Sequence, residues 1–216
     1  MTRPTPFTII VDTAEQLPFP FTNLRTDAEH DNELWDVKTV RGCLGRYPDS
    51  WGDYSVIGLE KRVAVERKSV SDLQNTILGF NDGHRTRFEG ELTNLSSLDG
   101  AGLVVVEGTY LDVITSAPEF GKKTRDQNAK TLSRSILAYM ADYNVAWQFS
   151  GDRDVAMYDT FHWLRRFWEN VDAARRKATR EKEREQRRLA KASELLQSRL
   201  FKTDLSNVSS INQGKV

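Results

Sequence analysis

The chain has a single cysteine, only three histidines and no long hydrophobic run. Cys43 alone cannot form an internal disulfide or a thiolate metal site, and the histidines lie too far apart in sequence for a metal-binding spacing. No apolar stretch approaches the roughly 20 residues of a membrane-spanning helix, and the N-terminus lacks the zones of a signal peptide. We therefore expect a cytoplasmic protein that does not associate with a membrane.

Neither sign of charge dominates the chain, but the charges are unevenly distributed. The 31 Lys and Arg balance the 31 Asp and Glu. Residues 171–216 hold 12 basic and 6 acidic groups, whereas residues 1–170 hold 19 basic and 25 acidic groups. An acidic N-terminal part with a basic C-terminal tail is compatible with a carboxylate metal site and a segment that binds phosphates. A solvated helix that only keeps the protein in solution explains the tail equally well.

Hydrophobic patterning predicts strands that alternate with helices. β-branched and apolar runs of strand length occur at 7–12, 35–40, 54–57, 62–68, 102–107 and 145–149. Apolar residues at helical spacing predict helices that start near 71, 84 and 132, and a last helix from about 152 into the charged stretch up to about 200. Ser71 and Gln74 match a capping box for the first of these helices. The alternation indicates an α/β fold.

A hairpin should bring carboxylates and an ammonium together. Glu66 and Lys68 share one face of their strand, and because the valines before them should face the core, we expect this pair on the more open side. Asp53 starts the partner strand, and a tight turn would fold it back beside the pair. Asp12, at the end of the first strand, is a candidate fourth member of the cluster.

Such a cluster suits the hydrolysis of a phosphodiester bond. Hard carboxylate oxygens hold Mg²⁺ or Mn²⁺ and leave coordination positions open. The metal would polarise the phosphate, and Lys68 would orient the attacking water or offset charge on the phosphate oxygens. The alternative for Glu66 and Lys68 is an ordinary exposed ion pair.

The same residues resemble the signature of the XPF-type structure-specific DNA endonucleases. The signature reads Gly-Asp, a gap, Glu-Arg-Lys, three residues and Asp, and it is matched here by Gly52-Asp53, Glu66-Arg67-Lys68 and Asp72. Residues 11–15 are similar to the family's first-strand motif, with Ala14 where the family has Arg. Residues 84–88, followed by Glu91 and Leu92, are similar to its basic-aromatic helix, and residues 104–108 resemble its next strand. The resemblance covers residues 7–170.

The resemblance implies a restriction-endonuclease-like core, a central mixed sheet flanked by helices, that cuts branched or flapped DNA with Mg²⁺ or Mn²⁺. The implied catalytic residues are Asp53, Glu66, Lys68 and Asp12, of which the three carboxylates would also bind the metal. Supporting roles fall to Glu15, Arg67 and Asp72. Arg85 and Arg87 would contact the DNA backbone, and ion pairs of these two with Glu89 or Glu91 are the alternative.

The chain departs from the family after its core. We expect residues 1–170 to form the nuclease domain and residues 171–202 to form a charged helical extension to it. In the family, a tandem helix-hairpin-helix module follows the nuclease core instead. Residues 203–216 should be disordered. A compact version of this kind resembles those of phages and prophages, which implies action on nucleoid DNA in repair or recombination, in a bacterial or phage-infected cell.

Two other functions stay open. The first is a catalytically silent DNA-binding or scaffold subunit of a nuclease complex, although the intact Asp53, Glu66 and Lys68 argue against it. The second is an interaction protein built on the charged helix, which would bind a protein partner or a second copy of the chain. The leucines from 189 onward form no sustained heptad, so a long coiled coil is not expected.

Overall fold

The computed structural model describes residues 2–26, 32–45, 51–79, 83–119 and 122–212. The chain divides into one compact unit that ends at Trp168 and a second that begins at Glu169. Within the described ranges, none of the helices combines the length and the apolar character needed to cross a bilayer.

The first unit is built on a six-stranded mixed sheet with the strand order β2-β1-β3-β4-β5-β6. The strands are β1 (Thr2–Asp12), β2 (Leu34–Gly42), β3 (Tyr54–Val56), β4 (Val63–Ser69), β5 (Ala101–Glu107) and β6 (Ala146–Phe149). The pairs β1–β3 and β3–β4 are antiparallel, and the pairs β1–β2, β4–β5 and β5–β6 are parallel. The prediction of a central mixed sheet is confirmed.

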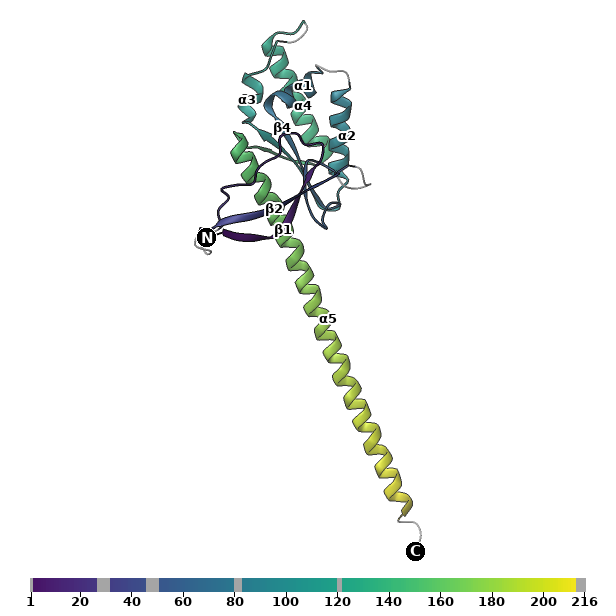
Figure 1. Ribbon diagram of the computed structural model, residues 1–216. Coiled ribbons are helices and arrows are strands. Elements are labelled where there is room, and N and C mark those ends of the chain that lie inside the picture. Colours follow the sequence, from purple (N-terminus) through teal and green to yellow (C-terminus); the bar gives the residue numbers. More distant parts are fainter. Residues whose placement is uncertain (1, 27–31, 46–50, 80–82, 120–121, 213–216) are drawn as a thin grey trace. The chain divides into compact units, whose positions relative to one another are not determined.

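Four helices cover one face of this sheet (Figure 1). They are α1 (Val70–Leu78), α2 (His84–Ser96), α3 (Tyr110–Thr115) and α4 (Arg125–Tyr143). Their apolar side chains form one buried cluster with Ala64 of β4 and with Val104 and Val106 of β5. Burial of this cluster, at roughly 25 cal/mol for each Å² of apolar surface, is the main force that holds the helices on the sheet.

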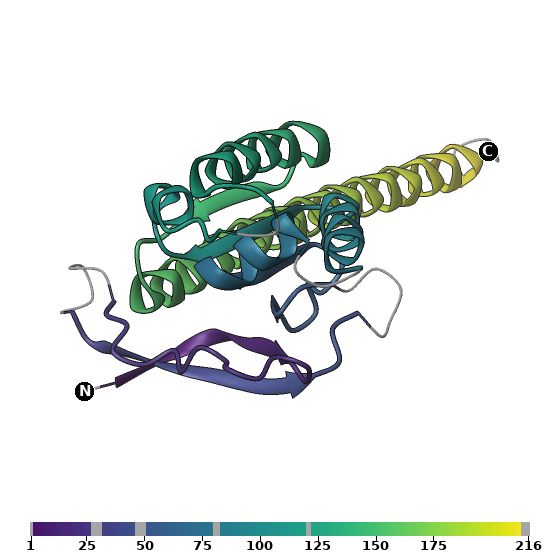
Figure 2. The same ribbon diagram turned by 90° about the horizontal axis from the view of Figure 1, so that it is seen from above.

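The opposite face of the sheet is covered by the start of α5 (Arg153–Asn212), the part of this helix that belongs to the first unit (Figure 2). The ring of Phe161 lies 5.9 Å from that of Phe7 on β1 and 6.1 Å from that of Trp35 on β2, measured between centroids. Because side chains alternate along a strand, Leu103 and Val105 of β5 lie on this face. The sheet is therefore buried on both sides, which accounts for its continuous apolar runs.

The second unit is the remainder of α5. The long charged C-terminal helix is thereby confirmed, and residues 173–194 are exposed along its whole circumference. A helix that is polar all round buries no apolar stripe of its own. We expected disorder from residue 203, whereas the structure has helical backbone through Asn212; residues 213–216 lie outside the described residues.

Three details differ from the sequence-based expectations. Ser69, rather than Ser71, caps α1, because its Oγ accepts a hydrogen bond from the backbone N–H of Asp72 at 3.1 Å. The short helix α3 was not expected, since its six residues are too few to show a period. Glu66 and Lys68 are only 7% and 8% exposed, because α1 and α2 cover the side of β4 that was expected to be open.

Candidate active site

A glycine allows Asp53 to enter the β3–β4 hairpin. Gly52 has φ +84°, and a Cβ atom at this position would lie 2.8 Å from the carbonyl oxygen of Val65. This close approach lets the backbone N–H of Asp53 donate to the same carbonyl at 2.8 Å. The Asp53 Oδ2 atom accepts in turn from the backbone N–H of Arg67 at 2.7 Å. The Gly-Asp pair therefore holds a carboxylate beside β4.

We expect Gly52→Ala to lower the free energy of unfolding by about 1–3 kcal/mol, because it combines a strained backbone with a contact too short for any Cβ. Urea denaturation measures this loss. Gly58→Ala is the matched control: Gly58 has φ +76°, but a Cβ there would meet nothing within 4 Å. Equal losses in the two variants would show that the approach to β4 contributes nothing.

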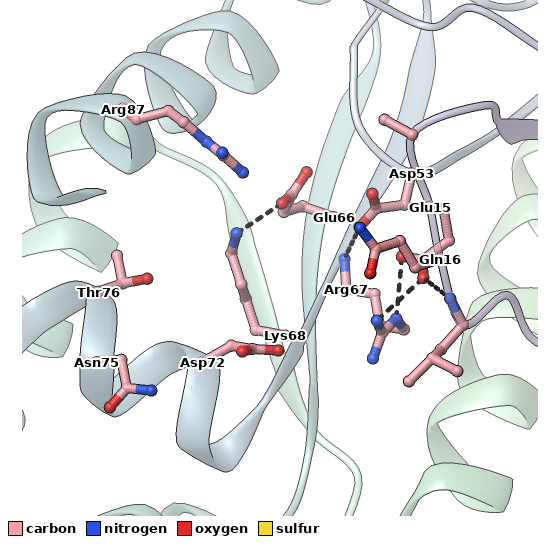
Figure 3. Close-up of a pocket in the computed structure, with 12 residues that line it drawn as sticks. Glu15, Gln16, Asp53, Glu66, Arg67, Lys68, Asp72, Asn75, Thr76 and Arg87 are labelled. Atoms are coloured by element: carbon pink, nitrogen blue, oxygen red, sulfur yellow. Dashed lines mark hydrogen bonds and ion pairs between the residues drawn. The ribbon is translucent and has the colours of Figure 1, made fainter. Parts of the chain in front are cut away.

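A cavity of about 490 Å³ opens at the carboxyl end of β4. Figure 3 shows Glu66 and Lys68 between residues of α1 on one side and Asp53 and Glu15 on the other. Its lining combines charged and polar side chains from four segments of the chain: Ala14, Glu15, Gln16, Leu17, Asp53, Glu66, Arg67, Lys68, Asp72, Asn75, Thr76 and Arg87. Seven of the nine residues singled out from the sequence, Arg87 among them, are thus brought to one place.

The ammonium of Lys68 lies between two carboxylates. Its Nζ is 2.8 Å from Glu66 Oε1 and 3.1 Å from Glu91 Oε2, and Glu91 Oε1 accepts from Arg87 Nε at 2.9 Å. Nζ also lies 4.9 Å from the centre of the Phe88 ring. The carboxylates of Glu66 and Glu91 raise the pKa of Lys68, although burial acts in the opposite direction, so the lysine stays charged.

Burial and the repulsion between carboxylates raise the pKa values of the two candidate ligands, Asp53 and Glu66. Burial raises the pKa of Asp53 to about 6, against the lowering effect of the Arg67 backbone N–H. Burial, followed by the charge of Asp53, raises the pKa of Glu66 to about 8 and outweighs the lowering effect of Lys68. A cation placed between these carboxylates would relieve their repulsion and displace their protons.

Arg67 lies on the other side of β4 from Glu66 and Lys68 and ties three segments together. Its Nη2 and Nε atoms donate to the carboxylate of Glu15 at 3.1 and 3.2 Å, and its Nη1 donates to Glu107 at the end of β5 at 3.1 Å. Arg153 of α5 also pairs with Glu107 and donates to the carbonyl oxygen of Leu17 at 2.5 Å. These contacts fix the loop after β1 that forms one wall of the cavity.

Asp12 is not placed with the other carboxylates. Its Oδ2 accepts from the backbone N–H of Ala14 at 3.0 Å, and its Oδ1 accepts from that of Leu44 at 2.7 Å. The first contact closes the turn after β1 and the second ties it to the segment after β2, and Asp12 is absent from the described residues that line the cavity. The metal-ligand role expected for Asp12 stays a prediction.

Of the three remaining predicted residues, Asp72 and Arg87 line the cavity and Arg85 does not. Asp72 lines the cavity, and its carboxylate accepts from Ser69 Oγ at 2.8 Å at the start of α1. Arg85 and Arg87 form ion pairs with Glu89 and Glu91 at 3.0 and 2.9 Å, which is the alternative arrangement considered for them. Of these two arginines, Arg87 lines the cavity.

The donor set at the cavity suits a small hard cation that brings its own water. The described residues contain no group of three or more His, Cys, Asp or Glu side chains that would hold a metal ion. Mg²⁺ is commonly bound through one or two carboxylates, several waters and the phosphates of a substrate. Asp53 and Glu66 provide two carboxylates and fit that pattern, whereas a structural zinc site needs four protein ligands.

Glu91, Glu107 and Arg153 are site residues that the sequence reasoning did not assign. The spacing of Arg87 and Glu91 predicted their ion pair, but no local pattern signals that Glu91 also reaches Lys68 on another element. Glu107 was expected only as the end of a strand, and Arg153 as the start of a helix. Each of them acquires its partners through tertiary packing alone.

Comparison with known proteins identifies the family. The model of the ERCC4 domain matches residues 26–167, about two thirds of the chain, and this range includes Asp53, Glu66 and Lys68 but not Asp12. No curated protein matches. Two solved structures are similar in part: XPF from Aeropyrum pernix (19% identity, TM-score 0.47, 74% of this chain and 60% of that one) and XPF from Aeropyrum pernix in complex with DNA (19%, 0.48, 76% and 66%). The matched region therefore spans less than two thirds of each of those chains. Because the family match covers more than half of its length, the chain belongs to the ERCC4 domain family, as the resemblance to XPF-type endonucleases predicted.

Proposed function

We propose that this protein is a metal-dependent DNA endonuclease. The observation that carries the proposal is the cavity at the end of β4, where the carboxylates of Asp53 and Glu66 meet the ammonium of Lys68. This combination occurs in a chain of the ERCC4 domain family. Keeping two ionisable carboxylates and a lysine in a buried position costs stability, which a purely structural cavity would avoid by apolar packing.

Asp53 and Glu66 would hold Mg²⁺ or Mn²⁺, and a bound ion would polarise the scissile phosphate and lower the pKa of a bound water. The chain's own residues do the rest. Lys68, at 2.8 Å from Glu66, donates to a phosphate oxygen and offsets the charge that develops there. The backbone N–H of Arg67 fixes one oxygen of Asp53 and leaves the other available as a ligand. Glu15 and Glu107 keep Arg67 in place.

Branched or flapped DNA is the substrate class that we propose, on the basis of family membership. Arg87 lines the cavity and pairs with Glu91 through its Nε atom, so its Nη groups would donate to a phosphate that approaches there. A silent scaffold subunit is the second candidate, and the presence of all three central residues in one cavity disfavours it.

A cleavage assay tests the proposal. Flap, fork, bubble and duplex DNAs labelled at one end are incubated with the protein alone, with Mg²⁺ and with Mn²⁺. We expect metal-dependent cleavage within the strand and a preference for one branched form, and none by the Asp53→Asn variant. Metal-independent cleavage would contradict the mechanism, and binding of every DNA without any cleavage would favour the scaffold subunit.

The exposed part of α5 is proposed to bind DNA or a partner rather than to take part in chemistry. Residues 171–200 hold ten Lys and Arg and five acidic groups. Each phosphate contact steepens the fall of log affinity with log salt by about 0.9. Truncation after Val171 should therefore weaken DNA binding and flatten its salt dependence, with nearly unchanged turnover at saturating DNA. Fluorescence anisotropy over a salt series measures the slope, and an unchanged slope would leave the helix as solvated surface or a protein-binding arm.

A further inference from the structure

The catalytic lysine has a second anchor on a different element. Lys68 Nζ contacts Glu66, two residues before it on β4, and also Glu91 on α2 at 3.1 Å. The carboxylate of Glu91 is only 23% exposed and is held at both oxygens, by Lys68 at Oε2 and by Arg87 at Oε1. Its orientation is therefore determined by two cations, one at each oxygen.

The two anchors of Lys68 cannot serve it equally during the reaction. If Glu66 is a metal ligand, as the proposed function requires, its charge and lone pairs are directed to the cation. A divalent cation near Glu66 also repels the ammonium. The carboxylate on α2 then remains the anion that keeps Nζ at the cavity, with the ring of Phe88 at 4.9 Å as a further weak attraction.

We propose that Glu91 is the positioning residue for Lys68, and that it keeps the ammonium directed at the substrate phosphate while Glu66 is engaged by metal. This inference rests on the proposed function and deepens it. Glu91 touches neither substrate nor metal in this role, and it acts through Lys68.

The chemistry of the pair explains why a carboxylate is needed at this position. Lysine and arginine are donors only, so a residue between Lys68 and Arg87 must accept on both of its terminal atoms. Glutamine has the same shape but one acceptor and one donor. In Glu91→Gln the amide NH₂ group must face either Lys68 or Arg87, and one of the two contacts becomes a repulsion between donors.

Glu89 provides a matched control on the same helix. It pairs with Arg85 at 3.0 Å with the same spacing of four residues, and its carboxylate also accepts from the hydroxyl of Tyr139 at 3.3 Å. In the part of the chain that the structure describes, the ion pairs of Lys68 are with Glu66 and Glu91 and not with Glu89. Glu89→Gln thus removes the same charge from α2 without touching the lysine.

The experiment compares single-turnover cleavage at saturating DNA with Mn²⁺, and DNA affinity without metal by anisotropy, for wild type, Glu91→Gln and Glu89→Gln. Loss of a residue that orients a group at a metal site by a hydrogen bond typically lowers activity about 10–100-fold. We expect Glu91→Gln to lower the cleavage rate about 10–100-fold with a dissociation constant within about threefold of wild type, and Glu89→Gln to change neither. A wild-type cleavage rate in Glu91→Gln, or an equal loss of rate in both variants, would overturn the inference. If the wild-type protein cleaves no DNA, the proposed function is overturned and the inference with it.

A double-mutant cycle separates positioning from a structural role. In a Lys68→Ala background, Glu91→Gln should cause no further loss of the residual rate, because its effect passes through the lysine. A further loss by the same factor would overturn the inference. Thermal unfolding is recorded for each variant, and if Glu91→Gln does not fold, Glu91→Asp replaces it, because the shorter side chain keeps both acceptors but withdraws them from Nζ. An unchanged rate in that variant would equally overturn it.

Discussion

Glu66→Gln is expected to abolish cleavage and to leave the protein folded. The variant removes a ligand of the proposed metal, and Lewis-acid stabilisation is worth several kcal/mol. Since each 1.36 kcal/mol corresponds to a factor of ten in rate, the loss should be on the order of 10³ or more. The substitution is isosteric, and Lys68 keeps Glu91 as a partner at 3.1 Å, so no buried cation is left alone.

The same variant should change how stability depends on pH. The pKa of Glu66 in the folded protein is about 8, above its ordinary value of 4.5. Between these pH values the folded state holds a proton that the unfolded chain has released, so the free energy of unfolding of the metal-free protein falls as pH rises. Glutamine lacks this titration. Glu66→Gln should therefore gain stability relative to wild type as pH rises through this window.

Cleavage with Mg²⁺ and Mn²⁺ and thermal unfolding with and without Mn²⁺ test both statements. Mn²⁺ should raise the melting temperature of wild type but hardly that of the variant. Glu119→Gln, at an exposed position away from the cavity, is the control and should behave as wild type. Near-normal cleavage by Glu66→Gln would remove Glu66 from the site.

Arg67→Met is expected to produce the largest loss of stability among these variants, about 3–5 kcal/mol in the free energy of unfolding. The side chains of Arg67 and Glu15 are 11% and 5% exposed, so methionine would leave the Glu15 carboxylate buried without its cation. Glu107 would retain Arg153. Urea denaturation measures the loss, and cleavage should fall as well, because the loop after β1 loses its attachment to β4.

A compensating change distinguishes a buried charge from lost packing. In the double variant Arg67→Met/Glu15→Gln the stranded carboxylate becomes neutral, so a large part of the stability should return. If the double variant is as unstable as Arg67→Met, the contribution of Arg67 lies in packing. A loss below about 1 kcal/mol in the single variant would show that the pair behaves like an exposed one.

Local patterns were sufficient for the framework of the fold. The runs that became β1 to β6 have strand length and β-branched residues, and the same alternation placed Glu66 and Lys68 on one side of β4. The Gly-Asp pair was informative because Gly52 must have positive φ and must meet the backbone of Val65, a requirement that glycine alone satisfies without strain. The signature residues Asp53, Glu66 and Lys68 could therefore be brought together from the sequence.

Tertiary packing decided the rest of the site. Asp12 lies at the end of a strand, where we expected a metal ligand. Its two carboxylate oxygens accept hydrogen bonds from backbone N–H groups, one of them from Leu44 far along the chain. Glu91 and Arg153 acquire their roles because α2 and α5 bring them to β4 and to the loop after β1. Sequence by itself determined which residues are candidates for the chemistry, since spacing along a strand governs the side that each one faces. Only the tertiary structure decided which of them share the cavity and what holds them, because those contacts join distant segments and leave no periodic trace.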